Sequence, residues 1–143
     1  MRIIADSSCD LYSLDYQVFK TVPLTIYTKE RSFVDDENLN ITEMLDYLAS
    51  YKDRSYTSCP SIDAFKEAFE GADEIFVMTI TSALSGSYNS ALNAAQMYKD
   101  EHPLAKIAVF DSLSTGAEEI LALQKLVKLI KEGKNFETIE EEI

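Results

Sequence analysis

The chain has 143 residues, of which 46% are hydrophobic, and this length and composition fit one folded domain with its own buried core. Thirteen Lys and Arg residues stand against 25 Asp and Glu residues, which gives a formal net charge of −12 at pH 7. Such a charge repels phosphate backbones and anionic lipid surfaces, so we expect neither a nucleic-acid partner nor stable membrane anchoring.

Two strands and one helix are expected in the first third of the chain. The apolar residues 2–5 predict a strand that ends at the sequence DSSCD (6–10), whose Asp and Ser residues are typical of turns and helix caps. The sequence TVPLTIY (21–27) predicts the next strand. The segment 40–51 begins with a polar Asn, and its apolar residues recur at the spacing of one helix face. These apolar residues are Ile41, Met44, Leu45 and Leu48.

The middle of the chain predicts a second helix and a buried strand. After the sequence YTSCPS (56–61), apolar residues again recur at helical spacing, with Ser61 as the expected N-cap and Asp63 at the positive end of the helix dipole. Gly71 supplies the stop signal. The helical apolar residues are Ile62, Phe65, Ala68 and Phe69. The sequence EIFVMTI (74–80) is a continuous apolar run, as expected for a strand covered on both faces.

The last third of the chain repeats this alternation. A helix from about Ser87 to Lys99 is followed by the apolar run KIAVF (106–110), which predicts another buried strand. A long helix over residues 116–131 comes next, and the tail NFETIEEEI (135–143) is typical of a helix that is just starting, so we expect a fragment of a longer chain. Strands that alternate with helices of this length predict an α/β fold, a mainly parallel sheet with helices on both faces.

The sequence carries no targeting or metal-binding signal. Its longest apolar runs, such as IFVM (75–78), are too short to cross a bilayer, and its first residues lack the apolar core of a signal peptide, so we expect a cytoplasmic protein. Cys9 and Cys59 form no CxxC pair and no Cys/His cluster. They therefore predict reduced thiols, with neither a disulfide framework nor a metal site, and no cofactor is indicated.

Four clusters of hydroxyl residues lie after predicted strands or before predicted helices. In a doubly wound sheet, loops at the carboxyl ends of the strands converge on one edge. The first amides of a helix are unpaired donors, Ser85 and Ser87 add hydroxyl donors, and Gly86 lets the backbone approach a ligand closely. This predicts a site for a small anion such as a carboxylate, a phosphate or an acyl phosphate. Each cluster taken singly also fits ordinary caps and turns. The clusters are DSSCD (6–10), TSCPS (57–61), TSALSGS (81–87) and DSLSTG (111–116).

The order of these clusters resembles the DegV family of lipid-binding proteins. The amino-terminal domain of that family has a strand ending in D-S-x-x-D-L, then P-L, T-S-x-P-S, L-S-G-T/S-Y-x-S-A and a loop of the type D-S-x-S-x-G. The resemblance spans essentially the whole chain. The matching segments are, in the same order, ADSSCDL (5–11), VPL (22–24), TSCPS (57–61), LSGSYNSA (84–91) and DSLSTG (111–116).

The resemblance implies that residues 1–143 form a DegV-like amino-terminal α/β domain, with the second domain of the family absent from this chain. Family members bind a long-chain fatty acid, whose carboxylate is held by the two hydroxyl motifs and whose tail lies in an apolar tunnel. In some bacteria they are the binding subunits of a fatty acid kinase and present the carboxylate for phosphorylation. The resemblance therefore implies a lipid-binding protein and not an enzyme.

Carried over residue by residue, the resemblance implies a set of contacts to the carboxylate. These contacts come from Thr57, Ser58, Ser85, Gly86 and Ser87. A supporting layer behind them is expected from Ser7, Ser61 and Ser112. The family's second domain closes over the ligand, and Cys59 stands where Gln is common in the family. Candidates for contact with the tail are Leu84, Ile62 and Phe65.

Two other classes of function stay open. A Ser-dependent hydrolase needs a base, but the single His, His102, lies in the charged sequence DEHPL (101–105), and no G-x-S-x-G elbow is present. A small phosphate-ligand-binding module would be favoured by a glycine-rich loop, but neither G-x-G-x-x-G nor G-x-x-x-x-G-K-[ST] occurs, and the chain has only four Gly. Cys59 precedes a predicted helix, whose N-terminus could activate a thiolate, although a small buried thiol is the simpler interpretation.

Overall fold

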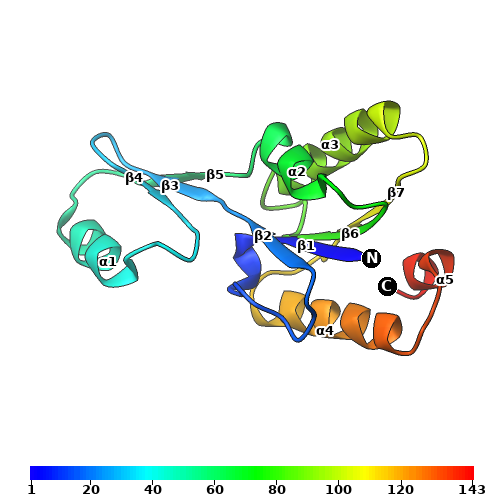
Figure 1. Ribbon diagram of the computed structural model, residues 1–143. Helices are drawn as coiled ribbons and strands as arrows, with labels where there is room; N and C mark the ends of the chain where they lie inside the picture. Colours follow the sequence, from blue (N-terminus) through cyan, green and yellow to red (C-terminus); the bar gives the residue numbers. More distant parts are fainter.

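A four-stranded parallel sheet forms the centre of the molecule (Figure 1). The computed structural model describes residues 1–143. The strands lie in the spatial order β2-β1-β6-β7, and each neighbouring pair is parallel. The chain leaves β1 toward one edge of the sheet and leaves β6 toward the other, so the β1/β6 pair is the topological switch point, where ligands bind in open α/β sheets. The strands are β1 (Arg2–Asp6), β2 (Phe19–Val22), β6 (Glu74–Thr79) and β7 (Lys106–Asp111).

Helices cover both faces of this sheet, as the alternating pattern predicts (Figure 1). Because successive side chains of a strand point to opposite faces, Ile3 and Ala5 of β1 lie in the core under α4 and α5, whereas Ile4 lies in the core under α2 and α3. The predicted α/β fold is confirmed. The helices are α2 (Ile62–Phe69), α3 (Ser87–Glu101), α4 (Ala117–Lys131) and α5 (Phe136–Glu142).

Helix boundaries in this part of the chain follow the predicted signals. Ser61 caps α2, because its side chain accepts a hydrogen bond from the N–H of Ala64, and Asp63 lies in the first turn. Gly71 follows this helix with a φ of 76°, a left-handed conformation that glycine adopts without strain. The last residues of the chain form the short helix α5, whose N-cap is Asn135. None of the helices combines the length and apolarity that crossing a membrane would require.

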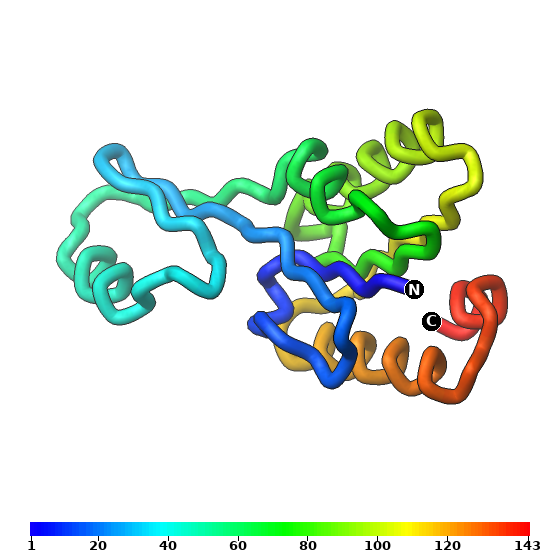
Figure 2. Tube along the Cα trace, viewed as in Figure 1, coloured from blue at the N-terminus to red at the C-terminus, as the bar shows by residue number.

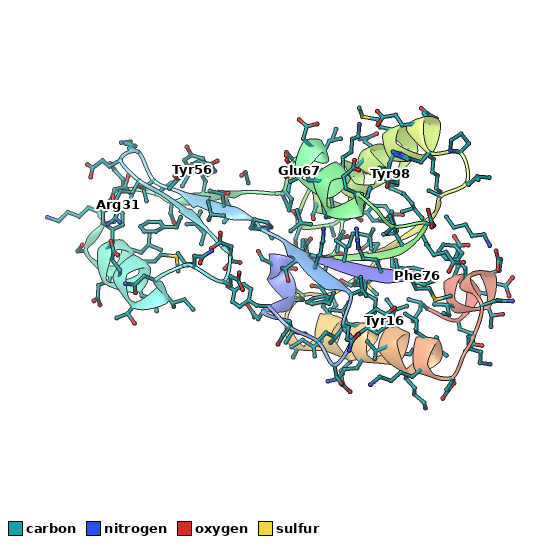
Figure 3. The ribbon with its side chains drawn as sticks, viewed as in Figure 1. Tyr16, Arg31, Tyr56, Glu67, Phe76 and Tyr98 are labelled. Atoms are coloured by element: carbon teal, nitrogen blue, oxygen red, sulfur yellow. The ribbon has the colours of Figure 1, made fainter.

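A separate arm, residues 24–58, projects from the sheet (Figures 1 and 2). Its antiparallel sheet has the order β4-β3-β5, and Figure 2 shows the chain leaving the parallel sheet after β2 and returning before α2. Figure 3 shows Arg31 and Tyr56 on this arm, well away from Phe76 in the parallel sheet. The elements of the arm are β3 (Thr25–Tyr27), β4 (Ser32–Val34), α1 (Ile41–Ser50) and β5 (Tyr56–Ser58).

The arm corrects the prediction of one strand over residues 21–27. The chain divides that segment between the two sheets, and Pro23 lies at the division. Proline has no N–H to donate to a strand neighbour, so the parallel ladder of β2 ends at Val22 and a new, antiparallel strand begins at Thr25. The prediction of a single strand over residues 21–27 is therefore wrong, because Thr25–Tyr27 belong to the antiparallel sheet and not to the parallel one.

Candidate functional site

Three of the hydroxyl clusters meet at the carboxyl ends of the parallel strands. The N–H of Thr81, in the loop after β6, donates to the carbonyl oxygen of Ser114, in the loop after β7, at 2.9 Å. The N–H of Gly116 donates to the carbonyl oxygen of Ser8 at 3.1 Å, which joins the loop after β7 to the loop after β1. The expected convergence of these loops on one edge of the sheet is therefore confirmed.

The fourth cluster, TSCPS (57–61), reaches this edge from the arm. Cys59 Sγ lies 3.8 Å from Ser90 Oγ on α3. A Cβ atom on Gly86 would lie only 3.3 Å from the same Sγ, so the close contact between the arm and the start of α3 depends on Gly86 having no side chain. The space beside Gly86 is thus occupied by Cys59.

Helix α3 begins without a side-chain cap, since its N-cap is Gly86. The first N–H groups of an α-helix have no acceptor inside the helix. The N–H of Ser87 donates to Ser85 Oγ at 3.2 Å, and the amides that follow it in the first turn point toward the edge where the loops meet. The positive end of the α3 dipole therefore faces this edge and favours a bound anion.

The predicted head-group residues fall into two kinds. Thr57 is exposed and Ser58 and Ser85 are half-buried, and the hydroxyl groups of these three residues donate no hydrogen bond within the chain. Ser87 is fully buried, and its hydroxyl group donates to Asp6 Oδ2. The first three hydroxyls are therefore free to donate to a ligand, whereas the proton of Ser87 is directed into the protein.

Each residue of the expected supporting layer has a partner inside the chain. Ser7 Oγ accepts from the N–H of Leu24 at 3.0 Å, which anchors the start of the arm beside β1. Ser61 caps α2, as described above. Ser112 Oγ donates to the carbonyl oxygen of Ser114 at 3.0 Å and shapes the turn after β7. These three serines support the loops of the edge and the start of a helix.

Asp6 occupies the centre of this edge and was missed by the sequence reasoning. It is the last residue of β1, it is 0% exposed, and its carboxylate joins three segments. Oδ1 accepts from Ser8 N at 3.3 Å and from Ser8 Oγ at 2.5 Å, whereas Oδ2 accepts from Ile80 N at 3.1 Å and from Ser87 Oγ. The signal in the sequence was an Asp that directly follows an apolar strand and begins a predicted loop.

Glu119, near the start of α4, is a second buried carboxyl group that the sequence reasoning missed. Its Oε2 lies 2.8 Å from Ser8 Oγ, and its Oε1 has no hydrogen-bond partner. Burial raises the pKa of Glu119 to about 8, and the nearby charge of Asp6 adds to the shift, so the neutral acid predominates at pH 7. The signal was the position of Glu119 four residues before the buried Leu123, on the apolar face of the helix.

The candidates for tail contact differ in accessibility. Leu84 is 73% exposed in the loop before α3, and Ile62 is partly buried at the start of α2. Phe65 is fully buried in the core, where its ring lies 6.4 Å from that of Phe69. Leu84 and Ile62 can therefore contact a ligand at the surface, whereas Phe65 is buried in the core and has no exposed surface to contact one.

The Ser/His pair that a Ser-dependent hydrolase needs is not assembled at this edge. His102 lies at the C-terminal end of α3, where its Nδ1 is 3.1 Å from the carbonyl oxygen of Tyr98. Helix α3 has 15 residues, so its two ends lie about 22 Å apart at 1.5 Å per residue. His102 therefore cannot act as a base for Ser85. Cys9 is buried, which raises the pKa of its thiol to about 12 and leaves it unreactive at pH 7.

Comparisons with known proteins agree with this architecture. The family model described as "Uncharacterised protein, DegV family" matches residues 1–143. A DegV domain-containing protein of Streptococcus pneumoniae is 45% identical over 146 residues, a match that covers 99% of this chain and 52% of that relative.

Two solved structures are similar to the chain over nearly its whole length. A DegV family protein from Eubacterium eligens, loaded with heptadecanoic acid, is 53% identical with a TM-score of 0.96, and the match covers 99% of this chain and 51% of that one. The Streptococcus pneumoniae Fatty Acid Kinase (Fak) B3 protein, loaded with linoleic acid, is 45% identical with a TM-score of 0.95, covering 98% of this chain and 51% of that one. The chain thus spans about half the length of these relatives. Because the family model matches residues 1–143, the chain belongs to the DegV family.

Proposed function

We propose that this chain binds a long-chain fatty acid and holds its carboxylate at the hydroxyl-rich edge of the parallel sheet. One observation carries this proposal: three hydroxyl groups that donate no hydrogen bond within the chain belong to segments that meet at the uncapped start of α3. Ser85 directly precedes this start, and Thr57 and Ser58 directly precede Cys59, whose Sγ lies beside Gly86. The similar structures from Eubacterium eligens and Streptococcus pneumoniae are loaded with fatty acids, which supports the same class of ligand here.

The chemistry of the edge suits a carboxylate head group. Hydroxyl and amide donors stabilise a negative charge without a positively charged side chain, and each hydrogen bond to a charged group contributes about 1.5 to 3 kcal/mol. The start of α3 adds the favourable field of the helix dipole, with Gly86 as its N-cap. We assign the direct contacts to Thr57, Ser58 and Ser85, and we place Ser87 in the first turn through its backbone.

The tail supplies most of the binding free energy in this proposal. Burial of one methylene group contributes about 0.8 kcal/mol, so a long acyl chain contributes roughly 10 kcal/mol before ordering costs. Leu84 and Ile62 are the candidates for the first contacts of the tail. The hydroxyl groups then orient the ligand and select a carboxylate over other polar ends.

We further propose that the chain acts as a binding subunit, which presents the carboxylate to the catalytic subunit of a fatty acid kinase in the cytoplasm. The similarity to the Fak B3 protein supports this role. The exposure of Thr57 and the partial exposure of Ser58 and Ser85 leave a bound carboxylate accessible to a partner that transfers a phosphoryl group. The single His lies about 22 Å from the start of α3, so no Ser/His pair is available at this edge for a Ser-dependent hydrolase.

Mass spectrometry of ligand extracted from the purified chain tests the class of ligand. We expect a long-chain fatty acid. Titration of the delipidated chain with a fluorescent fatty acid then tests the site, and the double variant Thr57→Ala/Ser85→Ala is expected to bind at least tenfold more weakly, since two hydrogen bonds to a charged group are lost.

The matched control is Thr42→Ala/Ser13→Ala, which removes an exposed Thr and an exposed Ser that lie outside the edge. This control is expected to keep the affinity of the unmodified chain. Recovery of a nucleotide, or equal affinities for both double variants, would contradict the proposal.

A further inference from the structure

The carboxylate of Asp6 connects both faces of the sheet at the topological switch point. Through Oδ2 it holds the N–H of Ile80 at the start of the loop after β6 and the hydroxyl of Ser87 in the first turn of α3. Through Oδ1 it holds Ser8, whose hydroxyl lies 2.8 Å from Glu119 Oε2 on α4. One buried group thus joins the helices that cover opposite faces.

A count of protons defines the state of this chain of groups. Ser8 Oγ lies within hydrogen-bonding distance of both Asp6 Oδ1 and Glu119 Oε2, but a hydroxyl group has only one proton to donate. Two ionised carboxylates would leave one of these close oxygen pairs without a proton. One of the two carboxyl groups therefore carries a proton. That group donates to Ser8 Oγ, and Ser8 Oγ donates its own proton to the other carboxyl group.

The surroundings place that proton on Glu119. Asp6 also receives the N–H groups of Ser8 and Ile80 and the hydroxyl of Ser87, which together stabilise a negative charge. Glu119 is 0% exposed, and its Oε1 has no donor, which a neutral carboxyl group tolerates far better than a carboxylate. Glu119 donates to Ser8, and Ser8 donates to Asp6.

We propose that Asp6 is the positioning residue of the carboxylate site and that protonated Glu119, acting through Ser8, keeps Asp6 in its working arrangement. This inference rests on the proposed function, because it concerns the same site. The loop that carries Ser85 is attached at one end by Asp6 to Ile80 and at the other end by Asp6 to Ser87. The position of the Ser85 hydroxyl therefore depends on a carboxylate that the ligand never touches.

The charge on Glu119 then determines how the site responds to pH. The titratable groups that face Glu119 are Asp6 on β1, Cys9 in the short 3-10 turn after β1, and Asp10 directly behind that turn. On the other elements packed against α4, Asp111 of β7 is the charged residue at this edge, and its carboxylate accepts from the N–H groups of Ser82 and Leu113. Lys106 lies at the opposite end of the sheet, where it pairs with Glu137 of α5. No cation is therefore present to compensate an ionised Glu119.

Loss of the Glu119 proton should weaken fatty acid binding for two reasons. The pKa of this group lies near 8 because it is buried and because Asp6 is close, so the proton is lost as the pH rises through that value. Ionisation breaks the hydrogen-bond chain to Asp6, and it also places a second negative charge behind a site that holds a carboxylate. Affinity is expected to be level below pH 7 and to fall above pH 8.

Glu119→Gln tests this inference, because the Gln side chain can donate to Ser8 as the neutral acid does but cannot ionise. Titration with a fluorescent fatty acid at pH values from about 6.5 to 9.5 should show at least a fivefold loss of affinity for the unmodified chain and less than a twofold change for the variant. Glu67→Gln, at an exposed position on α2, is the matched control and should follow the unmodified chain. A purely structural role of Glu119 would change the melting temperature without removing this pH dependence.

Two further readouts keep the inference testable if Glu119→Gln does not fold. The carboxyl carbon shift of Glu119 in the unmodified chain, followed by NMR, should titrate well above the ordinary 4.5, and its pKa should rise further when the fatty acid is added. Titration near 4.5, or a Gln variant that keeps the pH dependence of the unmodified chain, would overturn the inference and leave the proposed function standing. Absence of binding by the unmodified chain at every pH would overturn the proposed function, and this inference with it.

Discussion

The contact between Gly86 and Cys59 predicts that a single methyl group weakens both the fold and the site. Gly86→Ala would place a Cβ atom 3.3 Å from Cys59 Sγ, a few tenths of an ångström closer than ordinary contact. The φ of Gly86 is −76°, which Ala adopts freely, so the cost comes from crowding and from the poorer N-cap. Since the thiol can move slightly, we expect the free energy of unfolding to fall by about 1 to 2 kcal/mol.

The same substitution should push Cys59, and with it Thr57 and Ser58, away from the start of α3. We expect about a tenfold loss of affinity for a fatty acid, measured by fluorescence titration, and the loss of stability measured by urea denaturation. The double variant Gly86→Ala/Cys59→Ala removes the crowding and should recover about 1 kcal/mol relative to the sum of the single variants. If the two single effects simply add, the contact is not the cause and the reasoning fails.

Three other predictions concern stability. Phe65→Ala, at a fully buried position, should lower the free energy of unfolding by about 3 to 5 kcal/mol in urea denaturation, and a loss below about 1 kcal/mol would contradict its place in the core. The pKa of Glu119 is raised from 4.5 to about 8, so the folded state holds a proton that the unfolded state has lost between these values; stability should fall as the pH rises through this range, and Glu119→Gln should remove that part of the slope. Lys66→Ala breaks the ion pair with Glu101, whose side chain is 57% exposed, and should leave the midpoint of urea unfolding nearly unchanged because solvent screens the pair; a clear shift of the midpoint would contradict this expectation.

The central sheet could be predicted because its strands are short apolar runs separated by amphipathic helices. The run over residues 74–79 is buried on both faces at five of its six positions, which is why its continuous apolar character was a reliable signal. The division at Pro23 was harder, because Val22 and Thr25 are both typical strand residues and only the missing N–H of proline separates the two sheets. Local patterns identify strands, but they do not say which sheet a strand joins.

The candidate site was predictable in part for a similar reason. Hydroxyl clusters beside strand ends stand out in a sequence, and three of them do converge in space. Asp6 and Glu119 did not stand out, because acidic residues at strand ends and in the first turn of a helix are also common for capping and for the helix dipole. Their pairing joins residues 113 positions apart, through a serine that is common in any turn, and only the folded chain brings them together.

The proposed site lies between two parts of the molecule, the arm and the parallel sheet, that few contacts hold together. Residues 24–58 are joined to the rest of the molecule by two chain segments. Two hydrogen bonds also link them to the segment between β1 and β2: Leu24 N donates to Ser7 Oγ, and the Tyr12 hydroxyl donates to Asp35 Oδ1. The two sheets share no strand, so the arm can change its angle to the parallel sheet without breaking a ladder in either one. Thr57 and Ser58 would move with the arm, whereas Ser85 would stay with the sheet. A carboxylate that contacts both parts would connect the arm to the parallel sheet. Binding of the ligand would therefore also fix the angle between the arm and the sheet.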